Sequence, residues 1–191
     1  MAATPTDDLR DKIGRYLRSH HTMTIATMGP PPQVATGGPS PAAAPGVGRP
    51  AGAPPAGAGT DTAVQPHAAS VFYAVDDSLR LIFMSSPTSA HGLHIGTSGP
   101  VAVTVTEQYD DWELIQGVQL WGTARRLAGA ARVGALAVYF FRFPFVPELM
   151  EQPKLSETVR KIAVYRVEPR RVAFTDNTTG VFGREVLDLK G

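Results

Sequence analysis

Hydrophobic residues in the first 27 positions follow first a helical period and then a strand-like one. Thr6 precedes two acidic residues, the pattern of a helix N-cap followed by a first turn that favours negative charge. Residues 7–19 are predicted to form an amphipathic helix, because apolar residues recur at helical spacing at Leu9, Ile13, Tyr16 and Leu17. Residues 23–27 (MTIAT) are apolar and partly β-branched, and are predicted to form a first strand.

Strand-like patterns dominate after residue 66. Runs rich in β-branched and aromatic residues are separated by turn residues such as Asp76-Asp77-Ser78. Gly117 and Gly122 mark points of a bulge or of close backbone approach in one long run. The predicted strands are residues 69–75, 79–84, 101–106, 114–126, 162–167 and 172–175, the last two joined by Glu168-Pro169.

Two further helices are predicted among these strands. Residues 85–89 (SSPTS) have helix-cap chemistry and open a short helix through Ile95, and residues 129–141 form an apolar-rich helix. Residues 148–161 are expected to be helical or irregular. The residues expected to end the two helices are Gly99-Pro100, and Pro144 with Pro147. No strand–helix–strand rhythm runs through the chain, which disfavours a Rossmann sheet and favours a mostly antiparallel barrel with helices outside.

Residues 29–66 differ from the rest of the chain in composition. They hold 10 of the 17 prolines and 8 of the 19 glycines, and few large aliphatic residues. Such a segment buries too little apolar area to offset the entropy of ordering it. The segment is therefore predicted to be a mobile loop inserted in a single domain.

Charge and composition exclude several classes of protein. With 18 Lys and Arg against 17 Asp and Glu, the formal net charge is +1, too small for strong electrostatic binding of nucleic acid. Cysteine is absent, which excludes disulfides, thiol nucleophiles and iron–sulfur clusters. No apolar run has the roughly 20 residues that span a bilayer, and the first residues lack the pattern of a signal peptide. We therefore expect a cytoplasmic protein that binds neither membranes nor nucleic acid.

The usual catalytic motifs are also missing. The chain contains no HExxH, GxSxG or GxxxxGK[ST] motif, and its Asp-Asp pairs lie where caps and turns explain them, so no metal site and no catalytic residue is assigned. The most informative stretch is 84–91 (MSSPTSAH), where hydroxyls cluster at the start of a helix. Helix N-terminal N–H groups, hydroxyl donors and an imidazole could cradle a phosphate, although ordinary N-capping explains the same residues.

At this point the sequence resembles a known family. The order of ASVFYAVDDSLRLIFM, SSPTSAHGLHI, GPVAVTV and GVQLWGTARRL is similar to the pyridoxamine 5′-phosphate oxidase-like FMN-binding split barrels. The resemblance extends from about Ile13 to the C-terminus, apart from the 29–66 loop, and includes the later RFP at 142–144 and FTDNT at 174–178. It implies a mainly β (α+β) fold, a six- or seven-stranded antiparallel split β-barrel with peripheral helices.

The resemblance also implies a homodimer, with FMN bound in clefts between the subunits and a small molecule as substrate. Ala90 and His91 stand where the oxidases proper carry a basic pair on the FMN phosphate, and Arg184 could supply the missing charge. No histidine follows Asn177, so we do not expect oxidation of pyridoxamine phosphate. The candidate cofactor-binding residues are Ser70, Val71, Phe72, Tyr73, Met84, Ser85, Ser86, Ser89, Ala90, His91, Gln119, Asn177 and Arg184.

Other functions stay open beside a flavin-dependent oxidoreductase. The missing basic pair is compatible with a non-catalytic split barrel that stores or senses a cofactor. His91 and His94 are three residues apart on a predicted helix and share a face, so a haem-binding relative is an alternative. A deazaflavin-binding relative is another. The aromatic patch at 140–145 would either pack the outer helix onto the barrel or line a cleft.

Overall fold

Seven strands and four α-helices make up the described part of the chain. The computed structural model describes residues 5–31, 64–152, 161–180 and 183–189. The helices are α1 (Pro5–Ser19), α2 (Ala90–Ile95), α3 (Gly129–Arg142) and α4 (Phe145–Glu151), with short 3-10 turns η1 (Trp112–Leu114) and η2 (Asn177–Thr179). The strands are β1 (Thr22–Gly29), β2 (Gln65–Val75), β3 (Leu81–Ser85), β4 (Ser98–Thr106), β5 (Gln116–Arg126), β6 (Ala163–Asp176) and β7 (Arg184–Asp188).

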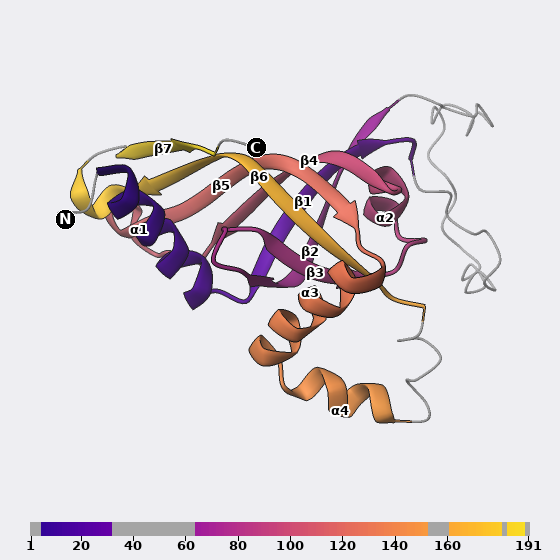
Figure 1. Ribbon diagram of the computed structural model, residues 1–191. Helices are drawn as coiled ribbons and strands as arrows, with labels where there is room; N and C mark the ends of the chain where they lie inside the picture. Colours follow the sequence, from indigo (N-terminus) through magenta and orange to yellow (C-terminus); the bar gives the residue numbers. More distant parts are fainter. Residues whose placement is uncertain (1–4, 32–63, 153–160, 181–182, 190–191) are drawn as a thin grey trace, which may run out of the picture.

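Antiparallel pairing closes six of these strands into a ring. The order across the sheet is β3-β2-β1-β4-β5-β6-β7, and an additional pairing of β3 with β6 completes the ring, leaving β7 outside on the edge of β6 (Figure 1). The 14 residues of β6 make this possible, because its first half pairs with β3 and its second half with β7 while β5 pairs along its length. The observed fold is a mainly β α+β fold, consistent with a split barrel.

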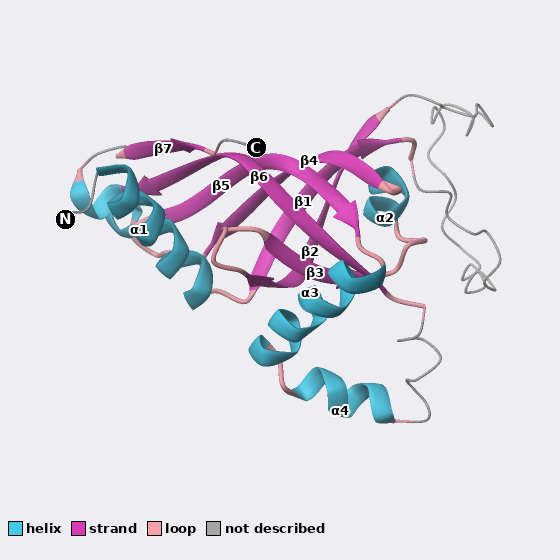
Figure 2. Ribbon diagram, viewed as in Figure 1, coloured by secondary structure: helices cyan, strands magenta, loops and turns pink. Residues whose placement is uncertain are grey.

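Alternating side chains fill the inside of the ring. Residues of the inner face form the larger apolar core with α1, whose Ile13 and Leu17 are fully buried. Figure 2 shows α1 and α2 near opposite ends of the barrel and α3 against its side. The smaller core lies on the outer face, where α3 residues such as Tyr139 pack against Ala74, Ile82 and Val164 of β2, β3 and β6.

The aromatic residues at the end of α3 differ in how deeply they are buried. Phe143 is buried in the smaller core and Phe140 packs against it, as the packing interpretation expects, whereas Phe141 is 92% exposed.

Among the described residues no single helix is long and apolar enough to cross a membrane; only α3 and α4 taken together, across a bend of 111°, meet that criterion of length and composition.

Two predicted breaks are wrong for local reasons. The short helix ends at Ile95 as predicted, but Gly96 ends it with a positive φ of 56°, and Gly99 and Pro100 lie inside β4. Glu168-Pro169 does not break a strand, because β6 is continuous there. A register shift between Trp121 and Gly122 accommodates Pro169, which has no N–H to donate.

Two further differences concern the ends of elements. Pro147 lies within the first turn of α4 rather than ending α3, since the first positions of a helix do not need the N–H that proline lacks. Gly29 pairs with Gln65, so both ends of the predicted 29–66 loop are strand. Residues 32–63 lie outside the described residues, as do residues 153–160 of the predicted 148–161 segment.

Candidate functional site

A row of small polar residues crosses the outer face of four strands. Ser70 of β2 pairs with Thr24 of β1, Thr24 pairs with Thr104 of β4, and Thr104 pairs with Gln119 of β5. Directly paired residues of an antiparallel sheet point to the same face. The next row is smaller still, with Ala26 beside Ala102. We call these residues the platform: Ser70, Thr24, Ala26, Ala102, Thr104 and Gln119.

A cation and an aromatic ring border the platform at its β5 side. Arg184 of β7 donates a hydrogen bond from Nη2 to Oε1 of Gln119 at 2.8 Å. Its guanidinium lies over the ring of Trp121, 5.9 Å from the ring centre. The structure therefore brings together two predicted site residues, Gln119 and Arg184, from strands separated by β6.

Two hollows lie on either side of Trp121. One of about 320 Å³ covers the platform between β1, β4 and β5 and includes Thr24, Thr104 and Gln119 in its lining. The other, of about 440 Å³, is lined by Trp121, Arg171, Ala173, Arg184 and Val186. Their lining combines small side chains, one indole and two guanidinium groups. Such a surface is suited to a flat, partly polar molecule that carries negative charge.

At the β2 side, the platform meets the end of α3. Phe72 is half exposed, and its ring contacts Phe143 edge-on, with ring centres 5.5 Å apart. Met84 packs against the same small core beside α3. Ser70, Phe72 and Met84 therefore share the outer face. Their neighbours in sequence point the other way.

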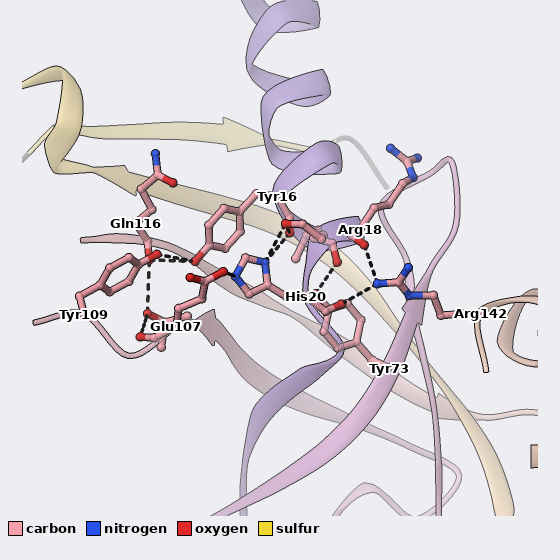
Figure 3. A network of polar contacts seen from close by, with 11 residues as sticks. Tyr16, Arg18, His20, Tyr73, Glu107, Tyr109, Gln116 and Arg142 are labelled. Atoms are coloured by element: carbon pink, nitrogen blue, oxygen red, sulfur yellow. Dashed lines mark hydrogen bonds and ion pairs between the residues drawn. The ribbon is translucent and has the colours of Figure 1, made fainter. Parts of the chain in front are cut away.

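Val71 and Tyr73 point into the barrel. Val71 packs against the main core and Tyr73 is fully buried, donating a hydrogen bond from its hydroxyl to the carbonyl oxygen of Leu17 at 2.6 Å. Arg142 donates to the carbonyl oxygen of Arg18 at 2.6 Å, so both side chains hold the C-terminal end of α1 (Figure 3). The role of Tyr73 in this structure is to anchor α1.

The same close-up shows a second polar group around α1. The hydroxyl of Tyr16 donates to the carbonyl oxygen of Gln116 at 2.9 Å and lies 3.3 Å from that of Tyr109 (Figure 3). Burial raises the pKa of Tyr16, with the Tyr109 contact adding to it. His20 places Nε2 2.7 Å from a Glu107 carboxylate oxygen. These contacts fasten α1 to the strand ends, and none of them involves a platform residue.

The serine-rich bend is organised mainly by its own hydrogen bonds. Ser89 is the N-cap of α2, and its Oγ accepts from the N–H of Gly92 at 3.2 Å and donates to the carbonyl oxygen of Ser86 at 2.7 Å. The Oγ of Ser86 lies 2.8 Å from the Thr88 hydroxyl. The capping interpretation is confirmed for Ser89. The N–H groups of Ala90 and His91, in the first turn, have no acceptor within the helix.

His91 is buried at the end of the barrel, where it is held by the bend. Its Nε2 lies 2.6 Å from the Ser85 hydroxyl and 3.1 Å from that of Ser89. Its Nδ1 has no hydrogen-bond partner among the described residues. Burial lowers the pKa of His91, and His67 and His94 lower it further. A neutral imidazole cannot replace the basic pair that holds phosphate in the oxidases.

The pattern of the sequence did not reveal that His67 joins this group. The rings of His67 and His91 are stacked with centres 6.0 Å apart, and His94 stands edge-on to His67 at 5.8 Å. Both ring nitrogens of His94 are engaged, Nδ1 with the Thr27 hydroxyl at 3.0 Å and Nε2 with the carbonyl oxygen of Pro30 at 2.8 Å. Within the described ranges, no group of three His, Cys, Asp or Glu side chains could hold a metal ion.

Asn177 lies apart from both groups. Its Nδ2 donates to the carbonyl oxygen of Trp112 at 2.8 Å, and its N–H donates to that of Ile115 at 3.0 Å. These bonds tie η2 to η1, which directly precedes the first residue of β5. The predicted residues thus fall into three groups. One group lies on or beside the platform, and a second points into the barrel or belongs to the serine-rich bend with His91. Asn177 lies apart from both.

Comparisons of the whole fold find solved structures that share it, in agreement with the split-barrel fold that the resemblance predicted. A heme-binding protein from Mycobacterium smegmatis superposes with a TM-score of 0.60 at 14% identity, covering 98% of this chain and 59% of that one. The conserved hypothetical protein Rv2991 from Mycobacterium tuberculosis gives 0.58 at 18% identity, covering 93% and 88%. The heme storage protein HutZ from Vibrio cholerae gives 0.53 at 12% identity, covering 83% and 88%. At these identities the likeness shows the fold alone.

Relatives in sequence are more specific. No protein-family model matches the chain. A UPF0306 protein of Klebsiella pneumoniae is 34% identical over 119 residues, which are 62% of this chain and 73% of that protein. The UPF0306 protein YhbP of Escherichia coli O157:H7 is 32% identical over 124 residues, 64% of this chain and 76% of that protein. Identity at this level over this much of the relatives' length shows that the chain belongs to the UPF0306 family of YhbP-like split-barrel proteins.

Proposed function

We propose that the protein binds FMN on the platform and acts as a flavin-dependent oxidoreductase on a small molecule. The observation that carries this proposal is the row of small side chains that ends at the Gln119–Arg184 hydrogen bond and the Trp121 ring. A flat ring system can approach a sheet only where side chains are short. The residues that border it, Phe72 on one side and Trp121 on the other, would limit its position and exclude water.

The residues of the platform fit the polar groups of a flavin. The Gln119 amide and the Ser70, Thr24 and Thr104 hydroxyls can donate and accept hydrogen bonds, as the heteroatoms of the ring and the ribityl chain require. Arg184 lines the neighbouring hollow and supplies positive charge for a phosphate, beside Arg171, whose Nε is paired with Asp188 at 3.1 Å. When bound, the flavin would supply the electron or hydride transfer, which explains why the sequence needs no conventional catalytic motif.

The platform is an outer surface, and we propose that a second copy of the chain covers it. Phe72, Trp121 and Val186 are large apolar side chains on this face, and each is between 41% and 51% exposed. Exposed apolar groups around a shallow site are typical of a surface that is buried on association. A homodimer would turn the open hollows into enclosed clefts between subunits.

Haem is the main competing ligand, because two of the superposed proteins are named for heme binding or storage. The platform favours a flavin, because none of its six residues is a usual axial ligand for iron. The histidines cluster instead at the barrel end, where His91 is buried and both ring nitrogens of His94 are occupied. A deazaflavin would also fit the ring surface, and its acidic tail would need more cations than Arg171 and Arg184.

Visible absorption of the purified protein tests the proposal. We expect flavin bands as isolated or after addition of FMN, with a dissociation constant in the micromolar range or lower by flavin fluorescence titration. Arg184→Leu should weaken FMN binding by about ten- to a hundredfold, because a hydrogen bond to a charged group contributes about 1.5 to 3 kcal/mol. Arg15→Gln, an exposed change on α1, should leave the affinity unchanged.

Three outcomes would contradict parts of this proposal. A Soret band in place of flavin bands would assign the platform or the histidine cluster to haem. No uptake of FMN at micromolar concentration would remove the flavin altogether. The third outcome is that NAD(P)H and chemical electron donors reduce the bound FMN but the reduced flavin passes electrons to no acceptor. The protein would then be a binding or sensing module. Sedimentation at micromolar concentration tests the dimer independently.

A further inference from the structure

Two of the side chains that hold α2 against the barrel are imidazoles. The helix lies beside the end of β1 and the start of β4 (Figure 1). With six residues, one of them Gly92, it is too short to be stable by itself. Its attachment therefore depends on the contacts that His91, His94 and Ile95 make with the rest of the chain.

His94 fastens α2 to the end of β1. A Cβ on Gly29 would lie 2.1 Å from Cδ2 of His94, so the ring packs directly on the β1 backbone. Because the carbonyl oxygen of Pro30 can only accept, the hydrogen of this bond is on Nε2. Nδ1 of the neutral ring then accepts from the buried Thr27 hydroxyl. A second proton on His94 would displace the hydrogen that Thr27 donates.

His91 fastens α2 to the serine-rich bend and to the end of β3. The hydroxyl hydrogen of Ser89 is used on the carbonyl oxygen of Ser86, so the Ser89–His91 contact requires a hydrogen on Nε2 of the ring. Nδ1 of the neutral ring is then unprotonated, and this atom is buried without a partner among the described residues. A second proton would create a buried N–H that has no acceptor, which is unfavourable.

His67 of β2 brings a third imidazole against the other two, at ring-centre distances of 6.0 Å from His91 and 5.8 Å from His94. Imidazoles in proteins usually change charge between about pH 5 and pH 8, and like charges at this separation repel each other. Among the described residues, no carboxylate, lysine or arginine acts on His91. In the same part of the chain, the histidine with an acidic partner is His20, outside this group. Positive charge in the histidine cluster is therefore uncompensated.

The attached and released positions of α2 differ in their affinity for protons. With α2 in place, burial lowers the pKa of His91, and His67 and His94 lower it further. An imidazole that leaves this position regains water and loses its positively charged neighbours, so its pKa returns toward the usual value. A fall in pH therefore favours the released position, because that position binds the proton more tightly.

We propose that His67, His91 and His94 form a pH-sensitive switch that releases α2 and the serine-rich bend from the barrel end in mild acid. The barrel itself remains closed, because the pairing of β3 with β6 involves none of the three histidines. The switch does not depend on the flavin proposal, since none of the three belongs to the platform.

Residue-resolved hydrogen exchange of the full chain at pH 7.5, 6.5 and 5.5 tests the switch. The N–H groups of Leu93 and Gly96 report on α2, because they donate to the carbonyl oxygens of Ser89 and Gly92 at 2.9 and 3.0 Å. After correction for the intrinsic pH dependence of exchange, their protection should fall by up to roughly tenfold per pH unit for each proton bound on release. Protection in the β4–β5 pairing should remain.

His91→Gln removes the titrating ring and keeps a donor for the serine hydroxyls, so protection of α2 should lose most of its pH dependence. The exposed His21→Gln is the matched control and should behave as the natural sequence does. A pH dependence that is unchanged in His91→Gln would overturn the proposal. Constant protection of α2 in the natural sequence would do so too, as would an equal loss in α2 and in the β4–β5 pairing, which indicates global unfolding.

His67→Gln provides a second test if His91→Gln does not fold. It removes one of the repelling charges at a half-buried position and leaves both attachments of α2 in place. Release should then begin at a lower pH than in the natural sequence. An unchanged pH of release would contradict the repulsion on which the switch rests.

Discussion

Lys12 and Asp176 form an ion pair that joins the first helix to the end of the longest strand. The Lys12 Nζ lies 2.8 Å from Asp176 Oδ2, and the Asp176 carboxylate is almost completely buried. Its Oδ1 accepts from Gln116 at 2.9 Å and from the Thr178 hydroxyl at 2.6 Å. Burial by itself would raise the pKa of Asp176, and these three partners outweigh it and hold that pKa well below its usual range.

Asp176→Asn should destabilise the protein by on the order of 1 to 3 kcal/mol, because the neutral amide removes the buried charge that pairs with Lys12 and leaves Lys12 only its more exposed partner, Glu185. The folded pKa lies below the unfolded value of about 4. The stabilisation is therefore present above pH 4 and lost as the pH falls toward the folded pKa. Urea unfolding between pH 7 and pH 3 measures it. In Asp176→Asn, the free energy of unfolding should fall less on acidification than in the natural sequence. Asp188→Asn, which breaks an exposed ion pair, should change that pH dependence little.

Gly122→Ala should destabilise the barrel by about 2 to 3 kcal/mol, the range found for overpacked sites. A Cβ at this position would lie only 2.2 Å from the carbonyl oxygen of Glu168, which is backbone and cannot move without disturbing the β5–β6 bulge. Gly134→Ala in α3 is the matched control, since nothing lies within 4 Å of its Cβ, and should stabilise by up to about 1 kcal/mol. Equal chemical unfolding midpoints for the two variants would contradict the proposed close approach.

His91 should make the protein less stable as the pH falls below about 6.5. Burial, with His67 and His94, lowers the pKa of His91, so the unfolded chain takes up a proton at a higher pH than the folded chain does. The free energy of unfolding should fall by up to about 1.4 kcal/mol per pH unit. His91→Gln should flatten that slope, and the exposed His21→Gln should preserve it. The measured quantity is the slope of the free energy of unfolding against pH. A loss of stability in His91→Gln that is the same at every pH would leave this slope unchanged.

Replacing residues 32–63 by Gly-Ser-Gly should leave the thermal midpoint unchanged or raise it by up to about 5 °C. Gly29 and Gln65 are already paired at the ends of β1 and β2, so a short connection can join the two strands. Shortening the connection reduces the entropy of closing it by roughly 0.6 kcal/mol per halving. Pro30 is retained because its carbonyl oxygen accepts from His94. A midpoint lowered by more than about 3 °C would show that the segment stabilises the barrel.

Local patterns predicted most of the fold because they depend on neighbouring residues. The α1 pattern places Ile13 and Leu17 in the core, and the hydroxyls of the bend identify Ser89 as a cap. β7 escaped prediction because its five residues are mostly exposed and alternate little in polarity. Pro169 indicated a break because the bulge that accommodates it, with Arg170 left out of the register opposite Trp121 and Gly122, exists only once β6 pairs with β5.

The candidate sites depend on pairings between distant segments, which a single sequence does not reveal. Gln119 and Arg184 are 65 residues apart and meet across β6, because β6 pairs with both β5 and β7. His91 and His94 share a helical face that the sequence shows, whereas His67 reaches them only through the β1–β2 pairing and the position of α2.

The position of Trp121 between two hollows gives the protein a built-in optical probe. The chain has only two tryptophans, and Trp121 belongs to the lining of both hollows on the outer sheet. In a Trp112→Phe background, a single indole would report by its emission on any molecule that enters either side. Ligand screening could then proceed without a label and without knowledge of the reaction.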